Sequence, residues 1–524
     1  MRTKCRRLAV KRSLILLLVL VFSWSLIDLV QAALINSKLS GDLVLGGDVI
    51  SYRISPDGKY AVFAADARTN NIVELFSVTL TGGRRLRISG ALPVDSEVQG
   101  FRITPDSQSV VYWTKNVDGY CTGIFVSSIA GGEVLNISES VPEFSSIVSS
   151  RITADNQYFV YALDYTEPAT EWYESLWAAP LDGSGSFTLN IPRNYDGQFY
   201  FEVLPAGSDV IVQRFGSGPI LLYLADMEGG AEPLDEFVYH FVITPDGDRV
   251  VYAKYDDQIG VFSISSTGVG KIRLSGDMVL GGEVVNLRIA PNSQQVVYLA
   301  DEVVDDRVEL FSAPVDGSTE RKQLLDVMIS GGDVIDFQIT PNSQGVVYLA
   351  DQVVDNRVDL RSVSINGGIS YWLSKEMVPG GIVRDYAITA NSLGVVFRAD
   401  KLVDDKDELF AVSIVGTLLT RLNTELPAGG DVMNFKISPN GQGVLYRADQ
   451  VVNDIINLYA VPVTGGVIPV RVNNQLTLGG TVQDFVITPD SQGALYLADQ
   501  DTDGVDELYA TFDRQIIFLP QTSK

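Results

Sequence analysis

Histidine and cysteine are nearly absent from this sequence. Its 524 residues include one histidine, His240, and two cysteines, Cys5 and Cys121. A single histidine excludes zinc, copper or iron sites built from several histidines, and it leaves a Ser-His-Asp triad only one candidate base. The nucleophile motif Gly-x-Ser-x-Gly is also missing, which argues against an α/β-hydrolase. Because His240 lies within the apolar segment 237–243, we expect it to be an ordinary strand residue.

Basic residues are scarce, with 39 Lys and Arg against 65 Asp and Glu, and six of them lie before residue 13. An uncharged apolar stretch, 13–27, follows this basic head, and Val30-Gln31-Ala32 supplies small residues. This order is typical of a secretory signal peptide, so residues 1–32 are predicted to be removed on export to the periplasm or the cell exterior. A membrane anchor is the competing interpretation. The apolar stretch of about 15 residues is shorter than the roughly 20 that a spanning helix needs, which favours cleavage.

Cleavage would make the mature chain, residues 33–524, more acidic still. It would remove six basic residues and one acidic residue, and the net charge would change from −26 to −31. Such a charge opposes binding to nucleic acids and to anionic membrane surfaces. We therefore expect a protein or glycan partner in the cell envelope or outside the cell. Cys121 would be the only cysteine left, so no intrachain disulfide could form.

A short phrase returns ten times after residue 33. Each copy has a strand-like run, then Ile-Ser/Thr-Pro-Asp/Asn-Gly/Ser or a close variant, then an apolar run that usually ends in Ala-Asp. Copies 1 to 10 are anchored at Ile54, Ile103, Ile152, Val203, Ile243, Ile289, Ile339, Ile388, Ile437 and Ile487. Successive anchors lie 49, 49, 51, 40, 46, 50, 49, 49 and 50 residues apart. A period near 50 residues is typical of a β-propeller in which each repeat forms one four-stranded blade.

Copy 7 shows how one repeat would build four strands. Residues 333–339 alternate apolar and polar side chains, as a half-buried strand does, and a Thr-Pro-Asn-Ser turn follows. Residues 345–350 are continuously apolar, which predicts a strand packed on both faces, and 358–365 and 369–374 are predicted as the third and fourth strands. We therefore predict an all-β chain, a β-propeller of ten four-stranded blades.

The arrangement of the blades has open alternatives. Even spacing without a linker favours one large ring, whereas two smaller rings, split near the degenerate fourth copy, would avoid exceeding the usual four to eight blades. Either terminus could complete the last blade, through residues 33–39 or 515–519. Copies 2 to 5 lack the Gly-Gly pair that precedes the anchor in the other copies, so we expect them to form an irregular arc.

The consensus Phe-x-Ile-Thr-Pro-Asp-Ser/Gly, Val-Val-Tyr-x-Ala-Asp, Glu-Leu-Phe/Tyr-Ser/Ala-Val and Gly-Gly resembles the repeats of TolB-like proteins, the PD40 branch of WD40-like repeats. Residues 485–510 are the best example, and the resemblance spans about residues 40–515. It implies a propeller fold and a family that includes periplasmic scaffolds and propellers attached to prolyl-oligopeptidase-type hydrolases. Only about a dozen residues separate Ala33 from copy 1, so we expect no counterpart of the α/β domain that precedes the propeller in TolB.

Carboxylates recur in the loop after the second predicted strand, where acidic or amide residues follow the strand-ending Asp by four and eight positions. Copy 10 is the richest, with Asp499, Asp501 and Asp503 beside Gly504. Alternating oxygens on a glycine-containing loop suit Ca²⁺, although Ala510 stands where an EF-hand-type loop would need its bidentate Glu. The alternative, which we favour, is a turn in which Asp and Asn side chains accept backbone N–H groups.

One loop has the character of a recognition element. In copy 3 the segment after the second strand is lengthened and carries Trp172 and Tyr173, whereas Trp177 stands where other copies have Phe or Tyr. Aromatic side chains on long loops are common anchors of interfaces, so Trp172 and Tyr173 are predicted to bind a partner; local packing is the alternative.

The sequence thus favours an exported propeller that serves as a non-catalytic scaffold for protein interaction or ligand binding. The alternative is a carbohydrate-active enzyme that uses a pair of carboxylates, because Asp and Glu are abundant on a fold that can host such chemistry. No carboxylate pair stands out from the repeated background.

Overall fold

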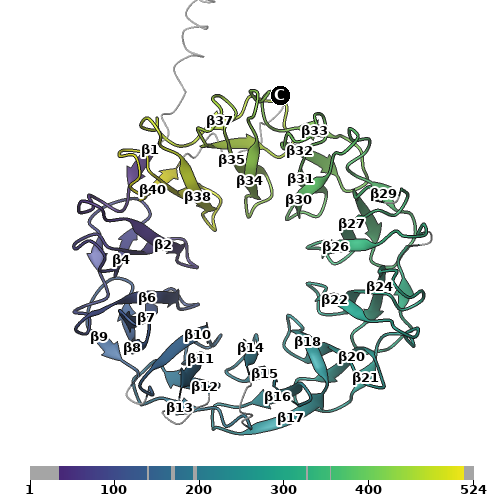
Figure 1. Ribbon diagram of the computed structural model, residues 1–524, viewed down its shortest axis with the longest axis horizontal. Helices are drawn as coiled ribbons and strands as arrows, with labels where there is room; N and C mark the ends of the chain where they lie inside the picture. Colours follow the sequence, from purple (N-terminus) through teal and green to yellow (C-terminus); the bar gives the residue numbers. More distant parts are fainter. Residues whose placement is uncertain are drawn as a thin grey trace, which may run out of the picture.

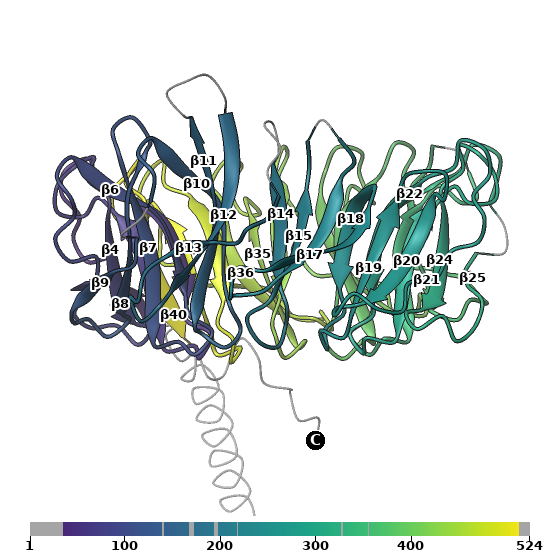
Figure 2. The same ribbon diagram turned by 90° about the horizontal axis from the view of Figure 1, so that it is seen from below.

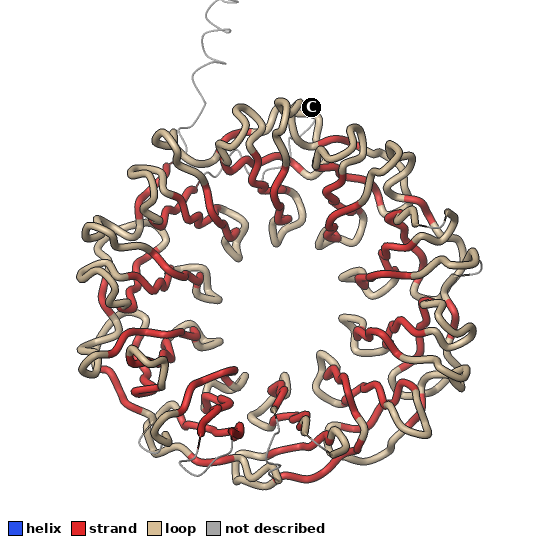
Figure 3. The backbone as a smooth tube through the Cα atoms, in the orientation of Figure 1, coloured by secondary structure: helices blue, strands red, loops and turns tan. Residues whose placement is uncertain are grey.

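The computed structural model describes residues 35–138, 141–166, 172–192, 198–216, 218–325, 328–354 and 356–512. This part of the chain holds forty strands and no helix (Figure 3). The strands form ten antiparallel sheets of four strands each, arranged as blades in a single ring (Figure 1). The prediction of a ten-bladed β-propeller is confirmed, and the two-ring alternative is wrong. Within the described ranges, no helix long and apolar enough to cross a membrane is found.

Each blade carries the anchor of the repeat with the same number, and its strands run in sequence order from the inside of the ring to the outside. Blades 1 to 3 contain β2 (Val49–Ile54), β3 (Tyr60–Ala65), β4 (Glu74–Thr79), β5 (Leu86–Arg87); β6 (Ser96–Ile103), β7 (Ser109–Asn116), β8 (Cys121–Ser128), β9 (Val134–Asn136); β10 (Ser145–Ile152), β11 (Tyr158–Thr166), β12 (Trp172–Pro180), β13 (Phe187–Thr188). Blades 4 to 6 contain β14 (Phe199–Val203), β15 (Val210–Arg214), β16 (Leu221–Ala225), β17 (Ala231–Glu236); β18 (Val238–Ile243), β19 (Arg249–Lys254), β20 (Gly260–Ser265), β21 (Ile272–Arg273); β22 (Val284–Ile289), β23 (Gln295–Ala300), β24 (Glu309–Pro314), β25 (Lys322–Gln323).

The remaining blades follow the same order, except that the last one borrows its outermost strand from the start of the chain. Blades 7 to 10 contain β26 (Val334–Ile339), β27 (Gly345–Ala350), β28 (Asp359–Ser364), β29 (Tyr371–Trp372); β30 (Val383–Ile388), β31 (Gly394–Ala399), β32 (Glu408–Ser413), β33 (Thr420–Arg421); β34 (Val432–Ile437), β35 (Gly443–Ala448), β36 (Asn457–Pro462), β37 (Val470–Arg471); β38 (Val482–Ile487), β39 (Gly493–Ala498), β40 (Glu507–Phe512) and β1 (Ile35–Lys38).

The N-terminal segment therefore closes the ring. Strand β1 pairs with β40, with Ile35 opposite Phe512 and Lys38 opposite Tyr509. Of the two segments that could have completed blade 10, the structure shows the first in place; the second, 515–519, lies outside the described residues, as does the predicted signal peptide, 1–32.

The hydrophobic core lies between blades rather than within one centre. In blade 6, Val296, Tyr298 and Ala300 of β23 pack against blade 5, whereas Val297 and Leu299, on the other face of the same strand, pack against blade 7. The continuously apolar second strands predicted from the sequence are therefore buried on both faces. A cluster of this kind fills each of the ten junctions, including the one between blades 10 and 1.

The alternating strand directions place the connections on two opposite faces of the ring. We call the upper face the one that carries the loops between second and third strands and the loops that enter each blade; the lower face carries the other turns (Figure 2). The fourth strand of blade 7 is shorter than the predicted 369–374. In blade 7, β29 has two residues, because only Tyr371 and Trp372 pair with β28.

Blades 2 and 3 of the irregular arc keep the entry turn of the regular blades without its glycine. Gly46 (φ 78°) lies three residues before Val49, and Asp95 (φ 55°) and Phe144 (φ 61°) hold the same position in blades 2 and 3. A left-handed backbone is costly for residues other than glycine, and it places the side chains of Asp95 and Phe144 where regular blades have none.

Candidate functional site

The aspartate that directly follows the second strand of each regular blade holds two loops in place, as a clamp. In blade 7, the backbone N–H of Asp333 donates to Oδ1 of Asp351 (2.6 Å), and that of Asn356 donates to Oδ2 (3.0 Å). Asp449 in blade 9 receives the N–H groups of Asp431 (2.6 Å) and Asp454 (3.0 Å) in the same way. Each clamp fixes the entry loop and the long upper loop of one blade with a single buried carboxylate.

The acidic residues four and eight positions later have separate structural partners. The residue at the fourth position lies against the entry glycine: a Cβ on Gly380 would come within 2.7 Å of Oδ1 of Asp404. The residue at the eighth position begins the third strand and is buried, and in blade 8 Arg421 donates to Glu408 at 2.9 Å. The repeated spacing of carboxylates therefore has a structural role in loop and strand packing.

The residues of the calcium hypothesis differ from one another in their surroundings. Asp499 is buried and accepts the backbone N–H groups of Thr481 and Gly504, whereas Asp501 and Asp503 are exposed. Among the described residues, the acidic group whose oxygens come within 4.8 Å of one another is instead Asp400, Asp404 and Asp405 of blade 8. These contacts agree with a turn held by carboxylates; calcium at Asp499, Asp501 and Asp503 stays a prediction.

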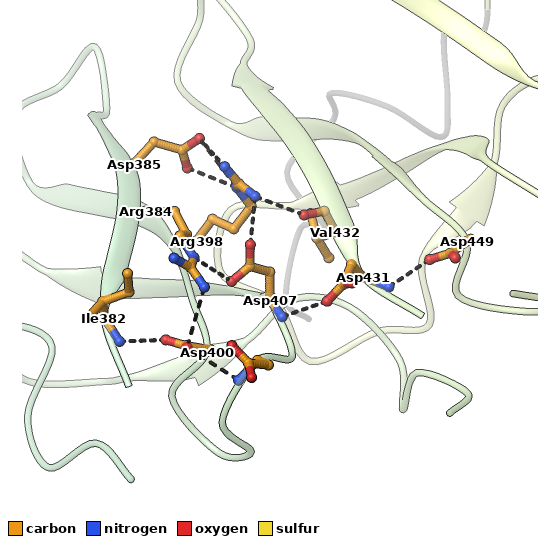
Figure 4. A network of polar contacts seen from close by, with 10 residues as sticks. Ile382, Arg384, Asp385, Arg398, Asp400, Asp407, Asp431, Val432 and Asp449 are labelled. Atoms are coloured by element: carbon orange, nitrogen blue, oxygen red, sulfur yellow. Dashed lines mark hydrogen bonds and ion pairs between the residues drawn. The ribbon is translucent and has the colours of Figure 1, made fainter. Parts of the chain in front are cut away.

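A network of polar contacts near the upper face combines ion pairs within blade 8 with hydrogen bonds to blade 9 (Figure 4). Arg398 donates to Asp385 (3.0 Å), to Asp407 (2.8 Å) and to the carbonyl of Val432 in the next blade (3.3 Å). The N–H of Asp407 donates in turn to Asp431 (2.7 Å), and burial raises the pKa of Asp431. Every carboxylate of this network is engaged within the ring, so we assign it to blade docking.

Trp172 and Tyr173 belong to a strand, which corrects their predicted place on a loop. Strands β11 and β12 are nine residues long, and Trp172 and Tyr173 pair with Thr166 and Tyr165. The hairpin is extended because antiparallel pairing continues past the point where regular blades open into a loop. It projects above the upper face (Figure 2). Trp177, predicted as a strand residue, lies in β12.

One carboxyl group of blade 3, that of Glu174, has a raised pKa. Burial raises the pKa of Glu174 to about 7, and the nearby Asp164 adds to the rise, whereas the N–H of Phe199, donated to Oε2 at 3.0 Å, opposes it. Glu174 lines a pocket of about 270 Å³ together with Asn190 and Phe199. A buried carboxyl with such a pKa can donate a proton near pH 7, as a general acid must.

The single histidine is a strand residue of blade 5. His240 lies half-buried in β18, as predicted, and burial lowers its pKa. A neutral, strand-bound imidazole on the inner strand of blade 5 fits a structural residue.

The upper loops of blades 6 to 9 expose apolar side chains at equivalent positions. Each loop carries two adjacent apolar residues that begin two positions after the clamp aspartate. The pairs are Val303-Val304, Val353-Val354, Leu402-Val403 and Val451-Val452. These side chains are between 41% and 70% exposed. In blades 6 and 8 two exposed aspartates follow the pair, and in blade 9 an exposed Asn and Asp follow it. The upper face therefore presents the same mixture of apolar and polar or acidic groups on four successive blades.

The inner wall of the ring carries charged residues that sequence analysis did not single out. The residue directly before the anchor is basic in five copies, Arg53, Arg102, Arg151, Arg288 and Lys436. Arg288 donates to Asp336 of the next blade at 2.9 Å and lies over the ring of Phe337. The basic residue recurs at one position of the repeat and could have been noticed in the sequence. The residue that pairs with Arg288 lies 48 positions away, however, and only the ring brings the two together.

No protein-family model matches this chain, and no curated protein matches its sequence. Solved structures with a similar fold include dipeptidyl peptidase 4 of Porphyromonas gingivalis (10% identity, TM-score 0.44, covering 67% of this chain and 57% of the peptidase). A second is a eukaryotic initiation factor (10% identity, TM-score 0.48, covering 91% of this chain and 95% of the factor). A third is an oligogalacturonate lyase in complex with manganese (11% identity, TM-score 0.35, covering 92% of this chain and 96% of the lyase). The chain thus spans little more than half of the peptidase. The class defined by the fold is the ten-bladed β-propeller.

Proposed function

We propose that this protein is an exported, non-catalytic scaffold that binds a protein partner on its upper face. The repeated apolar and acidic loops of blades 6 to 9 carry this proposal, because exposed apolar side chains that recur at one place on a rigid framework favour an interface. A partner surface with apolar and basic residues would match them. The resemblance to TolB-like repeats and the predicted signal peptide support a role in the periplasm or outside the cell.

The hydrogen bonds of the carboxylate pattern support a role without catalysis. Asp351, Asp449 and Asp499 each hold backbone N–H groups, and Glu408 and Asp407 are paired with arginines. A catalytic carboxylate has to be accessible to substrate, whereas these carboxylates are hydrogen-bonded or ion-paired within the ring.

Site-specific photo-cross-linking tests the proposal in cells that produce the protein. A photoreactive residue at Val353 or Leu402 should give a discrete cross-linked species. The same residue at Leu393, which is exposed on the lower-face turn between β30 and β31, should give none. Trp172→Ala combined with Tyr173→Ala should reduce the yield if the blade 3 hairpin takes part. Cross-links from the lower face alone, or from neither face, would contradict the proposal.

A carboxylate-pair glycosidase is the second candidate, because the raised pKa of Glu174 gives this function a specific residue. Asp164 lies opposite Glu174 in the register of β11 and β12 and would be its partner carboxylate. Hydrolysis of a glycan by the purified protein, abolished by Glu174→Gln, would establish the enzyme and overturn the scaffold. We expect no turnover.

A further inference from the structure

Three arginines line the inner wall of blades 1 to 3. Arg53, Arg102 and Arg151 occupy one register position on β2, β6 and β10, each opposite a valine of the second strand. These three strands are neighbours on the inside of the ring (Figure 1). Arg53 is exposed, and Arg102 and Arg151 are half-buried. Burial lowers the pKa of Arg102, and the positive charges of Arg53 and Arg151 lower it further.

Within the described part of the chain, two of the three guanidinium groups have no carboxylate partner. Arg151 forms a bidentate ion pair with Glu202, in which Nη2 donates to Oε1 at 2.7 Å and Nε donates to Oε2 at 3.0 Å. Arg53 lies over the ring of Phe101 at 5.9 Å, and no ion pair is found for Arg53 or Arg102 among the residues that the structure describes. Blade 3 has Ser150 where an aromatic ring would lie beside Arg102. An unpaired, half-buried guanidinium beside two others is unfavourable unless an anion compensates it.

At one position of the inner strand, blades 1 to 3 lack the acidic residue that three other blades carry there. Three residues before the anchor, blades 7, 8 and 10 carry Asp336, Asp385 and Asp484, and each has a basic side chain within 4 Å. At the same position, blades 1 to 3 have Ser51, Gly100 and Ser149. The inner wall is therefore positive on one arc and mixed on the other, in a protein whose net charge is −26.

We propose that the arc formed by Arg53, Arg102 and Arg151 is a binding site for a small anion with two or more acid groups, such as a polycarboxylate or a pyrophosphate. Guanidinium groups bind carboxylate and phosphate oxygens through paired hydrogen bonds, and adjacent blades present two of them free. A short anion touches only this arc. A long polyanion would also meet Asp336, Asp385 and Asp484, and the acidic surface as a whole repels it. This site is separate from the upper-face interface and does not depend on it.

Calorimetric titration of the purified protein at low ionic strength tests this site. The probes are citrate for polycarboxylates, pyrophosphate for phosphates, and acetate as the anion with one acid group. We expect saturable binding of citrate or pyrophosphate and none of acetate. Arg102→Gln and Arg53→Gln should each weaken binding at least about tenfold, and Arg102→Lys should weaken it less than Arg102→Gln because the charge remains.

The matched control is Arg288→Gln, which removes the same charge at the same strand position from a residue already paired with Asp336. It should leave the dissociation constant within about twofold. Without ligand, Arg102→Gln should keep or raise the melting temperature, because it relieves repulsion from Arg53 and Arg151; a structural role would lower it. Absence of saturable binding by citrate and pyrophosphate, or equal weakening by Arg288→Gln, would overturn the proposal.

Discussion

The backbone N–H of Asp506, near the end of the last blade, donates a hydrogen bond of 2.9 Å to Oδ1 of Asp48, at the entry of the first. The same bond joins internal neighbours, from Val308 to Asp333 (2.8 Å) and from Asp407 to Asp431 (2.7 Å). The junction that closes the ring is therefore built like the junctions within it. The difference is that the outermost strand of blade 10, β1, comes from the N-terminal end of the chain.

Lys38 should stabilise this closure. It forms an ion pair with the buried Glu507; burial lowers the pKa of Lys38, but Glu507 and Asp501 outweigh it and raise the pKa overall. Lys38→Met leaves Glu507 buried without its cation, and we expect the free energy of unfolding to fall by about 1–3 kcal/mol in urea denaturation. Lys59→Met, which removes an exposed pair with Asp57, should cost less than about 0.5 kcal/mol. Equal losses from both variants would show that the pair does not hold the ring closed.

The clamp at Asp351 should be among the costliest single sites in the loops. Asp351→Ala leaves two N–H groups without their acceptor, so we expect a loss of about 2–4 kcal/mol in the free energy of unfolding. Asp351→Asn keeps one side-chain oxygen and should lose less. The exposed Asp277, changed to Ala, serves as the control and should have little effect. If Asp351→Ala behaves like Asp277→Ala, the clamp contributes nothing to stability.

Calcium should not change the stability of the protein. The carboxylate of Asp499 is already occupied by two backbone N–H groups, so the loop of blade 10 lacks a free central ligand. We expect the melting temperature to be unchanged by millimolar CaCl₂. The double variant Asp501→Ala, Asp503→Ala is the control. A clear increase with calcium that this variant abolishes would establish the metal site, since a ligand that binds the folded state raises its stability.

Glu174 should make stability fall as the pH rises. Its pKa is about 7 in the folded protein against 4.5 ordinarily, so between these values the folded state keeps a proton that the unfolded state has lost. The free energy of unfolding should therefore decrease from about pH 4.5 to pH 7, by at most about 3 kcal/mol.

Glu174→Gln removes this pH-dependent contribution to the free energy of unfolding, and the glutamine side chain can still accept the N–H of Phe199. Its melting temperature should exceed that of the unmodified protein at pH 8 and match it near pH 4.5. The exposed Glu133, changed to Gln, is the control for the loss of one negative charge. Identical pH profiles for Glu174→Gln and the unmodified protein would refute the assignment.

The sequence predicted the repeats, the all-β class and the blade count, because strand periodicity and turn residues are local signals. It did not predict the inner wall. Arg288 and Asp336 are 48 residues apart, and only the curvature of the ring sets one beside the other. The role of the loop carboxylates was left open for a similar reason, since the donors to Asp351 come from two loops on either side of its strand. The loop expected at Trp172 became strand because pairing across the blade 3 hairpin extends further than turn residues indicated.

The affinity of the partner recovered by cross-linking tests the central claim most directly. Replacement of Val353, Val354, Leu402 and Val403 by serine removes the exposed apolar pairs of blades 7 and 8 from the upper face. The control replaces the exposed lower-face residues Leu393 and Leu418 by serine. A scaffold that binds through its upper face should lose at least about tenfold in affinity with the first variant and less than about twofold with the second. Unchanged affinity in the upper-face variant, or a larger loss in the lower-face control, would contradict the account.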